Sequence, residues 1–249
     1  MHILTVASGK GGVGKTTVAF ELAHLLSETR RVVALDIDPQ ASLTAFFGVD
    51  APDMADVLTG ARLARDALTR ITDTLSLIGA DGGLVSAELV IAAKPIRREE
   101  TLKRVLSTLA GLADVIVIDT PPALGLLTLN ALVASDGVLV VTLPEAAALG
   151  TLRATLASVE QVQEINPSLK LLGVLANGTA GHLNHHAHAI EAMQAERLHL
   201  LSVSIPRTIA LANMAALHEP INQYDKSHPA AAAFRELSGV ILKWLKQTK

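Results

Sequence analysis

The 249-residue chain contains no cysteine. Disulfides, thiolate catalysis, cysteine-type zinc sites and cysteine-held iron–sulfur clusters are therefore excluded. Aromatic residues make up only 2% of the sequence, which disfavours a base-stacking platform for single-stranded nucleic acid. The formal net charge of -3 gives no basic signature, and this argues mildly against a dedicated nucleic-acid binder.

Long apolar runs are missing as well. No uninterrupted run is long enough to span a bilayer, and Asp136 interrupts the best candidate. No charged segment followed by an apolar one opens the chain in the manner of a signal peptide, so we expect a cytoplasmic protein. Half of the residues are apolar and no linker-like stretch divides them, which predicts a single domain over residues 1–249 with a large core.

Short apolar runs alternate with helical patterns along the chain. Several runs are apolar throughout and rich in Val, Ile and Leu, which is typical of strands buried on both faces. Strand–helix alternation predicts an α/β fold with a doubly wound, mostly parallel sheet. The expected strands are 3–7, 32–35, 75–78, 115–118, 138–143, 171–176 and 200–205. The expected helices are 16–28, 99–112, 125–135, 147–165, 184–197 and 229–249.

The last of these helices is strongly amphipathic. One side carries the apolar residues Phe234, Leu237, Val240, Ile241, Trp244 and Leu245. The opposite side carries the basic residues Arg235, Lys243, Lys246 and Lys249. We expect a helix docked on the sheet with a solvated basic face. The alternative is a helix that lies in a membrane interface.

A glycine-rich loop, Gly-Lys-Gly-Gly-Val-Gly-Lys-Thr-Thr from Gly9 to Thr17, links the first strand to the first helix. Strand, glycine loop and helix together form the context of a phosphate-binding loop. Backbone amides there can surround phosphate oxygens, and the helix start adds positive potential. Lys15 would neutralise the β- and γ-phosphates, and the Thr16 hydroxyl would bind magnesium. The nucleotide-binding candidates of this loop are Gly11, Gly12, Val13, Gly14, Lys15, Thr16 and Thr17.

Two acidic motifs follow strands. Asp119 ends the run 115–118 in the manner of a Walker B motif and would hold magnesium through water, opposite Thr16. Asp36 and Asp38 follow the run 32–35 and lie on the same side of the chain. One of these two could orient the attacking water in phosphoryl transfer. Alternatively both cap a turn before a proline, an interpretation that suits Asp36 better than Asp38.

Lys10 is not specified by a plain phosphate loop. With it, the loop resembles the deviant Walker A box of the ParA/MinD ATPases. The resemblance covers nearly the whole chain, including 119–132, 165–175, 205–207 and 224–230. It implies a P-loop NTPase that uses ATP and Mg²⁺, and specifically a DNA partition ATPase of the short ParA type, serving a chromosome or a plasmid.

The same resemblance implies roles for further residues. Lys10 would reach across a dimer interface to the partner's nucleotide, and Asp38 would orient the attacking water. Pro206 and Arg207 would border the adenine, with Asn177 as a further neighbour. ATP would close a homodimer, a ParB-type protein would stimulate hydrolysis, and the dimer would bind DNA non-specifically and associate with the nucleoid.

The chain departs from short ParA proteins at two arginines that the family associates with DNA. Residues 178–182 replace a Met-Tyr-Asp-x-Arg stretch, and Ala210 stands where a second arginine is usual. DNA contacts would then come from Arg235, Lys243 and Lys246, with a second cluster formed by Lys94, Arg97, Arg98, Lys103 and Arg104. One alternative is a MinD-like membrane-associated ATPase or another cargo-positioning ATPase that does not bind DNA. Another is an ATP-dependent metabolic ligase, for which the sequence shows no pocket of convergent polar groups.

Four histidines, His182, His185, His186 and His188, cluster near the start of the helix expected at 184–197. On a helix, His182 and His186 would share a face at metal-ligand spacing. Glu191 is the only nearby acid, and no cysteine completes a zinc site. A solvated loop or helix start is therefore favoured over a metal site, with a contact surface for phosphates or a partner as an intermediate hypothesis.

Overall fold

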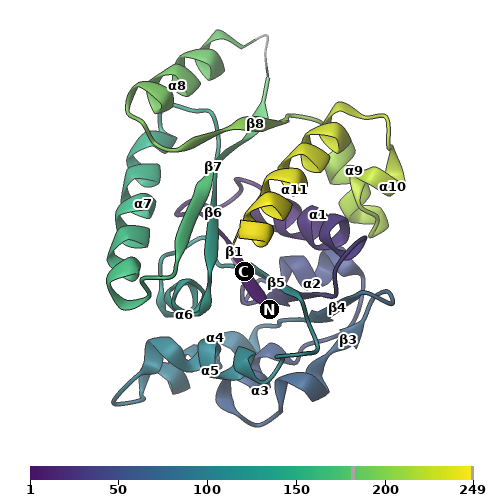
Figure 1. Ribbon diagram of the computed structural model, residues 1–249, viewed down its shortest axis with the longest axis vertical. Helices are drawn as coiled ribbons and strands as arrows, with labels where there is room; N and C mark the ends of the chain where they lie inside the picture. Colours follow the sequence, from purple (N-terminus) through teal and green to yellow (C-terminus); the bar gives the residue numbers. More distant parts are fainter. Residues whose placement is uncertain (181–182, 248–249) are drawn as a thin grey trace.

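The computed structural model describes residues 1–180 and 183–247, and within them one central sheet carries helices on both faces (Figure 1). The sheet has eight strands in the order β3-β4-β2-β5-β1-β6-β7-β8. Every pairing is parallel except that of β3 with β4. The strands are β1 His2–Ala7, β2 Val32–Asp36, β3 Thr69–Arg70, β4 Leu75–Ile78, β5 Val115–Asp119, β6 Gly137–Thr142, β7 Lys170–Thr179 and β8 Leu200–Pro206.

Helices separate most of these strands, which confirms the predicted α/β, doubly wound, mostly parallel sheet. In chain order the helices are α1 Lys15–Ser27, α2 Ser42–Phe47, α3 Met54–Thr59, α4 Gly83–Ala92, α5 Thr101–Ser107, α6 Leu126–Ala134, α7 Ala148–Ile165, α8 Asn184–Ala195, α9 Ala210–Leu217, α10 Ile221–Tyr224 and α11 Pro229–Gln247. Alternate strand residues supply the two faces of the sheet, so that Leu4 and Val6 belong to one core cluster while Ile3 belongs to another.

The elements that the sequence did not predict are mostly short. β3 is a two-residue antiparallel edge strand, and α2 and α3 have six residues each, too few for a helical period to be visible. α4, α9 and α10 were not predicted either. The helix expected at 99–112 is shorter than predicted, because α5 ends at Ser107 and the chain turns through Gly111, whose φ is +84°.

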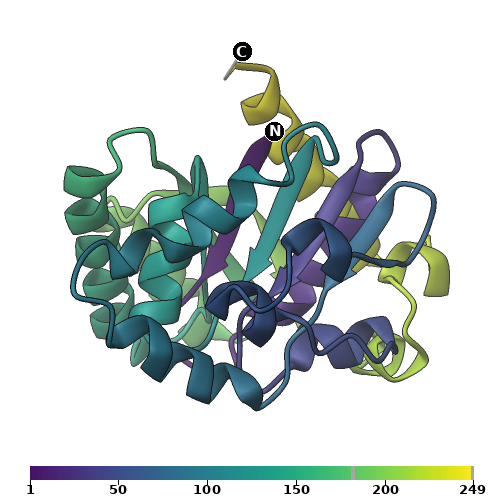
Figure 2. The ribbon, with the colours of Figure 1, turned by 90° about the horizontal axis from the view of Figure 1, so that it is seen from below.

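The terminal helix α11 packs against the sheet through its apolar side, which confirms the prediction of core packing. Phe234, Leu237 and Ile241 are fully buried and contact the cluster around α1. The ring of Trp244 meets that of His2 edge to face, with 5.8 Å between the centroids, so the end of α11 lies beside the start of β1 (Figures 1 and 2). Across the described residues, no helix combines the length and apolarity needed to cross a bilayer.

The strand order places the motifs at one edge. β5 lies between β1 and β2, so the phosphate loop after β1 and the carboxylates that end β2 and β5 emerge together. Asp119 is the register partner of both Val6 and Asp36. The predicted convergence of the three motifs at the carboxyl ends of the strands is thus confirmed.

Candidate functional site

The loop between β1 and α1 depends on two glycines with left-handed backbone conformations. Gly12 has a φ of +73° and Gly14, which caps α1, a φ of +88°. A Cβ at Gly14 would lie only 2.2 Å from Nδ2 of Asn177, so a larger residue would displace that side chain and would also strain the left-handed backbone. α1 begins at Lys15, and the unpaired amides of its first turn favour an anion at this position.

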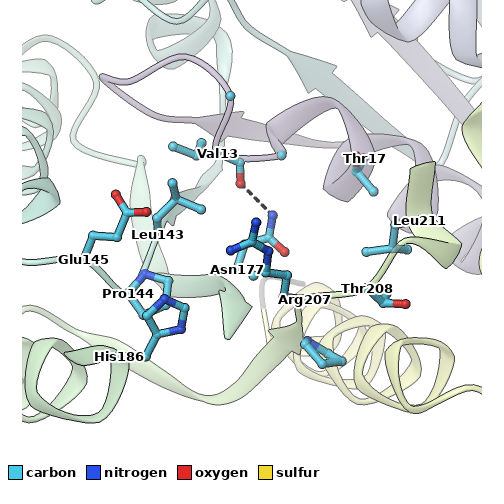
Figure 3. A pocket seen from close by; sticks show the side chains of 14 residues that line it. Val13, Thr17, Leu143, Pro144, Glu145, Asn177, His186, Arg207, Thr208 and Leu211 are labelled. Carbon is cyan, nitrogen blue, oxygen red and sulfur yellow. Dashed lines mark hydrogen bonds between the residues drawn. The ribbon is translucent and has the colours of Figure 1, made fainter. Parts of the chain in front are cut away.

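Asn177, near the end of β7, holds the loop in place. Its Nδ2 donates a hydrogen bond to the carbonyl oxygen of Val13 over 2.6 Å, drawn as the dashed line in Figure 3. The Asn177 side chain is 9% exposed and lines the cavity next to this bond. One side chain therefore connects the phosphate loop to the far half of the sheet.

Asp119 and Thr16 form a pair suited to a divalent cation. Oδ2 of Asp119 accepts a hydrogen bond from the Thr16 hydroxyl over 2.7 Å. Within the described residues, Oδ1 of Asp119 is buried without a hydrogen-bond partner. Burial, followed by repulsion from Asp36, raises the pKa of Asp119 to about 8. An unsatisfied carboxylate oxygen beside a hydroxyl fits Mg²⁺, which prefers oxygen ligands and opposes protonation of the carboxylate.

Asp36 and Asp38 differ in what they contact. Asp36 is fully buried and accepts hydrogen bonds from the amide and hydroxyl of Thr44, each over 2.8 Å, and from the Asp38 amide over 3.1 Å. Burial raises the pKa of Asp36 to about 6. Asp38 accepts a hydrogen bond from the Gln40 amide over 2.9 Å. Asp36 therefore ties the turn after β2 to α2, and Asp38 caps the turn that contains Pro39, so both carboxylates make the contacts that the turn-capping alternative predicted.

Lys15 is the cation of the buried edge. Its side chain is 6% exposed, and burial lowers its pKa while the Asp119 and Asp38 carboxylates raise it. Three aspartates and one lysine leave this edge rich in negative charge, and buried charges require partners. No group of three or more His, Cys, Asp or Glu in the described part of the chain could hold a metal ion. A cation at Thr16 and Asp119 would thus complete its ligands with phosphate and water.

Lys10 forms an ion pair with a residue of the loop after β6. Its ammonium lies 3.3 Å from Oε2 of Glu145 in the loop after β6, and both side chains are about two-fifths exposed, at 41% and 42%. Exposed ion pairs of this kind stabilise a fold by about 0–1 kcal/mol, so this one can be exchanged for another partner at little cost. Sequence reasoning did not identify Glu145.

A cavity of about 350 Å³ opens beside the phosphate loop (Figure 3). The three residues predicted near the adenine, Asn177, Pro206 and Arg207, all line it. Residues of the loop, Gly12, Val13, Gly14 and Thr17, form its opposite end. The lining also includes residues that sequence reasoning missed: Leu143, Pro144, Glu145, Thr208 and Leu211. They come from separate segments and share no motif, so no sequence signal could have grouped them.

The histidine cluster divides into members with different surroundings. His182 lies outside the described residues. His185 and His188 are exposed. His186 is 6% exposed and lines the cavity, and its Nδ1 accepts a hydrogen bond from the Ala180 amide over 3.1 Å.

Two kinds of sequence comparison relate this chain to known proteins. The family model described as AAA domain matches residues 1–171. The chromosome-partitioning ATPase Soj of Thermus thermophilus is 35% identical, with 96% of this chain and 94% of that protein covered. The sporulation initiation inhibitor protein Soj of Bacillus subtilis is 34% identical, with 95% and 96% covered.

Solved structures share the fold over the full length. A structure named cobyrinic acid a,c-diamide synthase from Mycobacterium smegmatis, with bound ATP analogue and magnesium, has a TM-score of 0.87 at 34% identity and covers 100% of this chain and 97% of its own. A Cyanothece McdA(D38A)–ATP complex has a TM-score of 0.86 at 26% identity, with 100% and 97% covered. Full-length similarity to Soj, together with the matched domain, shows that this chain belongs to the AAA domain family and, within it, to the ParA family of partition ATPases.

Proposed function

We propose that this chain is an ATP-driven partition switch, which hydrolyses ATP with Mg²⁺ and alternates between a monomer and an ATP-bound homodimer. The observation that carries the proposal is the Asp119–Thr16 pair at the foot of the phosphate loop. Among the described residues, the buried Oδ1 of Asp119 has no hydrogen-bond partner, which suits a bound cation. The cavity beside the loop is of a size that suits a nucleoside.

The chemistry follows from charge and position. The loop amides and Lys15 bind the phosphates, and Thr16, with Asp119 through water, holds Mg²⁺. The Mg²⁺ ion offsets the charge of the β- and γ-phosphates. Asp38 orients the attacking water, while Asp36 is engaged in its own turn. The nucleoside lies toward Asn177, Pro206 and Arg207.

Dimerisation uses Lys10. In the ATP-bound dimer Lys10 leaves Glu145 and contacts the partner subunit's nucleotide. The exposed Lys10–Glu145 pair supports this step, because breaking it costs little. ATP then stabilises the dimer by its higher affinity for that state, and hydrolysis releases it.

The cargo of the proposed switch is DNA. Relatives of the chain are named for chromosome partitioning, and we extend this role to the chain, with a ParB-type protein as activator and non-specific DNA binding as the means of nucleoid association. Lys243 and Lys246 are exposed on α11 and supply the contact. The third candidate, Arg235, donates hydrogen bonds to Asn222 and to the Lys226 carbonyl, so it contributes less.

The test is DNA binding measured by fluorescence anisotropy with ATP, with ADP and without nucleotide, at several salt concentrations. We expect weak, sequence-independent binding with ATP alone. The double variant Lys243→Glu, Lys246→Glu should reduce the salt slope by roughly one unit per lost phosphate contact. Arg65→Glu, Lys170→Glu, at two exposed positions outside both candidate clusters, has the same change of net charge and serves as the control. If the protein bound DNA in none of the three nucleotide states, its cargo would not be DNA, and the chain would instead be an ATPase that positions another cargo.

A second candidate is amide synthesis on a corrinoid, favoured by the likeness to the Mycobacterium smegmatis protein. Two observations weigh against it. The sequence has no cysteine to act as a thiolate nucleophile that releases ammonia from glutamine. The cavity of about 350 Å³ also suits a nucleotide rather than a macrocycle. ATP hydrolysis that depends on a corrinoid acid and ammonia, with no response to DNA, would establish this candidate instead.

A further inference from the structure

His186 is the one histidine of its cluster that is both described and buried. It sits in the first turn of α8, only 6% exposed, while its neighbours His185 and His188 face solvent. A buried histidine in a helix is ordinarily a core residue. This one instead lines the cavity beside the phosphate loop (Figure 3).

The orientation of the ring is fixed from behind. Nδ1 of His186 accepts a hydrogen bond from the amide of Ala180, which directly follows β7. Accepting this bond requires an unprotonated Nδ1, so the neutral ring carries its proton on Nε2. The bond joins the start of α8 to the residue that follows β7, the strand that also carries Asn177.

The position of the ring in the cavity determines which part of a ligand it can meet. The phosphate end is formed by Gly12, Val13, Gly14 and Thr17 of the loop and the start of α1. His186 lies at the end of the cavity away from Val13 (Figure 3). A side chain at that end contacts the part of a nucleotide that ATP and ADP have in common.

We propose that His186 is a nucleoside-binding residue, whose ring surface packs on the base or ribose of the bound nucleotide. This inference rests on the proposed function, since it assumes that the cavity binds ATP. It gives one member of the histidine cluster a role in nucleotide affinity and selectivity, which a metal-binding interpretation of the cluster would not.

The test compares His186→Ala and His186→Phe with the wild-type protein. His185→Ala and His188→Ala are the matched controls from the same helix. Dissociation constants for ATP and ADP are measured by calorimetry with Mg²⁺, and that for inorganic tripolyphosphate by displacement of a fluorescent ATP analogue. Thermal unfolding of every variant shows whether α8 remains folded.

The contact of one ring with a nucleoside corresponds to about three- to tenfold in affinity. We therefore expect His186→Ala to lower the affinities for ATP and ADP by the same factor, within that range, and to leave the affinity for tripolyphosphate unchanged. His186→Phe keeps a ring and should remain within about twofold of wild type, and the controls should not change.

Three results would overturn the inference: unchanged nucleotide affinity in His186→Ala, an equal loss for tripolyphosphate, or a loss in His186→Phe as large as in His186→Ala. Wild-type protein that binds neither ATP nor ADP would refute the proposed function itself, which keeps the two failures apart.

Discussion

The two ends of the cavity are built in different ways. The phosphate end comes from one continuous segment, in which Gly12 and Gly14 adopt positive φ and Lys15 starts α1. The rest of the lining brings together short stretches that are far apart in the sequence: 143–145 after β6, 177–178 in β7, His186 in α8, 206–208 at the end of β8, and Leu211. A continuous segment can be recognised as a motif, whereas the scattered set exists only once β6, β7 and β8 are placed side by side.

Asn177 connects the two ends. Its side chain donates a hydrogen bond to Val13 in the loop, and Ala180, three residues further along the chain, donates one to His186.

The phosphate end should provide most of the free energy of nucleotide binding, because it contacts the charged part of the ligand. The nucleoside end should adjust affinity by smaller factors.

The largest expected effect is the loss of ATP binding in Lys15→Ala. This substitution removes the buried point charge that meets the phosphates, so affinity should fall at least about a hundredfold. Calorimetry with Mg²⁺ measures it. Lys10→Ala, which changes an exposed lysine in the same loop, is the control and should still bind ATP. If Lys15→Ala bound ATP with wild-type affinity, the phosphate end could not be the main source of binding free energy.

The second effect is on hydrolysis. Asp38→Ala should slow ATP turnover by roughly a hundredfold or more, since a group that positions water is lost. ATP affinity should change little. Phosphate release under saturating ATP is the measurement, and a normal rate would transfer the role to another group at the same edge.

The third effect separates Asp36 from Asp38. Asp36→Ala leaves the Thr44 amide and hydroxyl and the Asp38 amide without their acceptor in the interior, which should cost about 2–4 kcal/mol of unfolding free energy. Urea denaturation of both variants decides, with Asp38→Ala expected to lose much less. Equal losses would show that the two carboxylates share one structural role.

The smallest expected effect is on the pH dependence of stability, and it arises from Glu21 on α1. Glu21 is buried, its Oε1 accepts a hydrogen bond from the Ile221 amide, and burial raises its pKa to about 7. Between its ordinary pKa and 7 the folded state binds more protons than the unfolded state, so stability falls as pH rises through that window.

Glu21→Gln cannot ionise and keeps the acceptor for Ile221. The variant should be more stable than wild type at pH 8, by on the order of 1–3 kcal/mol, and nearly equal to it at pH 5. Burial also lowers the pKa of His24, on the same helix, to about 4. This shift reduces stability below pH 6.5 equally in wild type and variant, so it cancels when their unfolding free energies are subtracted. A constant difference across pH would contradict the prediction.

Sequence reasoning predicted what contiguous patterns encode. The buried strands, the glycine loop and Asp119 follow from local chemistry, and the fold class follows from their alternation. The six-residue helices α2 and α3 did not show a period. Glu145 and His186 could not be assigned to the cavity, because each lies in a segment whose neighbours depend on the strand order. The roles of Lys10 and Asp38 stay predictions.

The account depends most on the ATP-bound dimer. Light scattering of the slow-hydrolysing Asp38→Ala variant, with and without the added Lys10→Ala substitution, measures it directly. With ATP and Mg²⁺ the mass should be twice the chain mass of 26.1 kDa, and it should return to the single-chain value with ADP or with Lys10→Ala. A mass that does not respond to ATP, or an ATP dimer that persists in Lys10→Ala, would contradict the account.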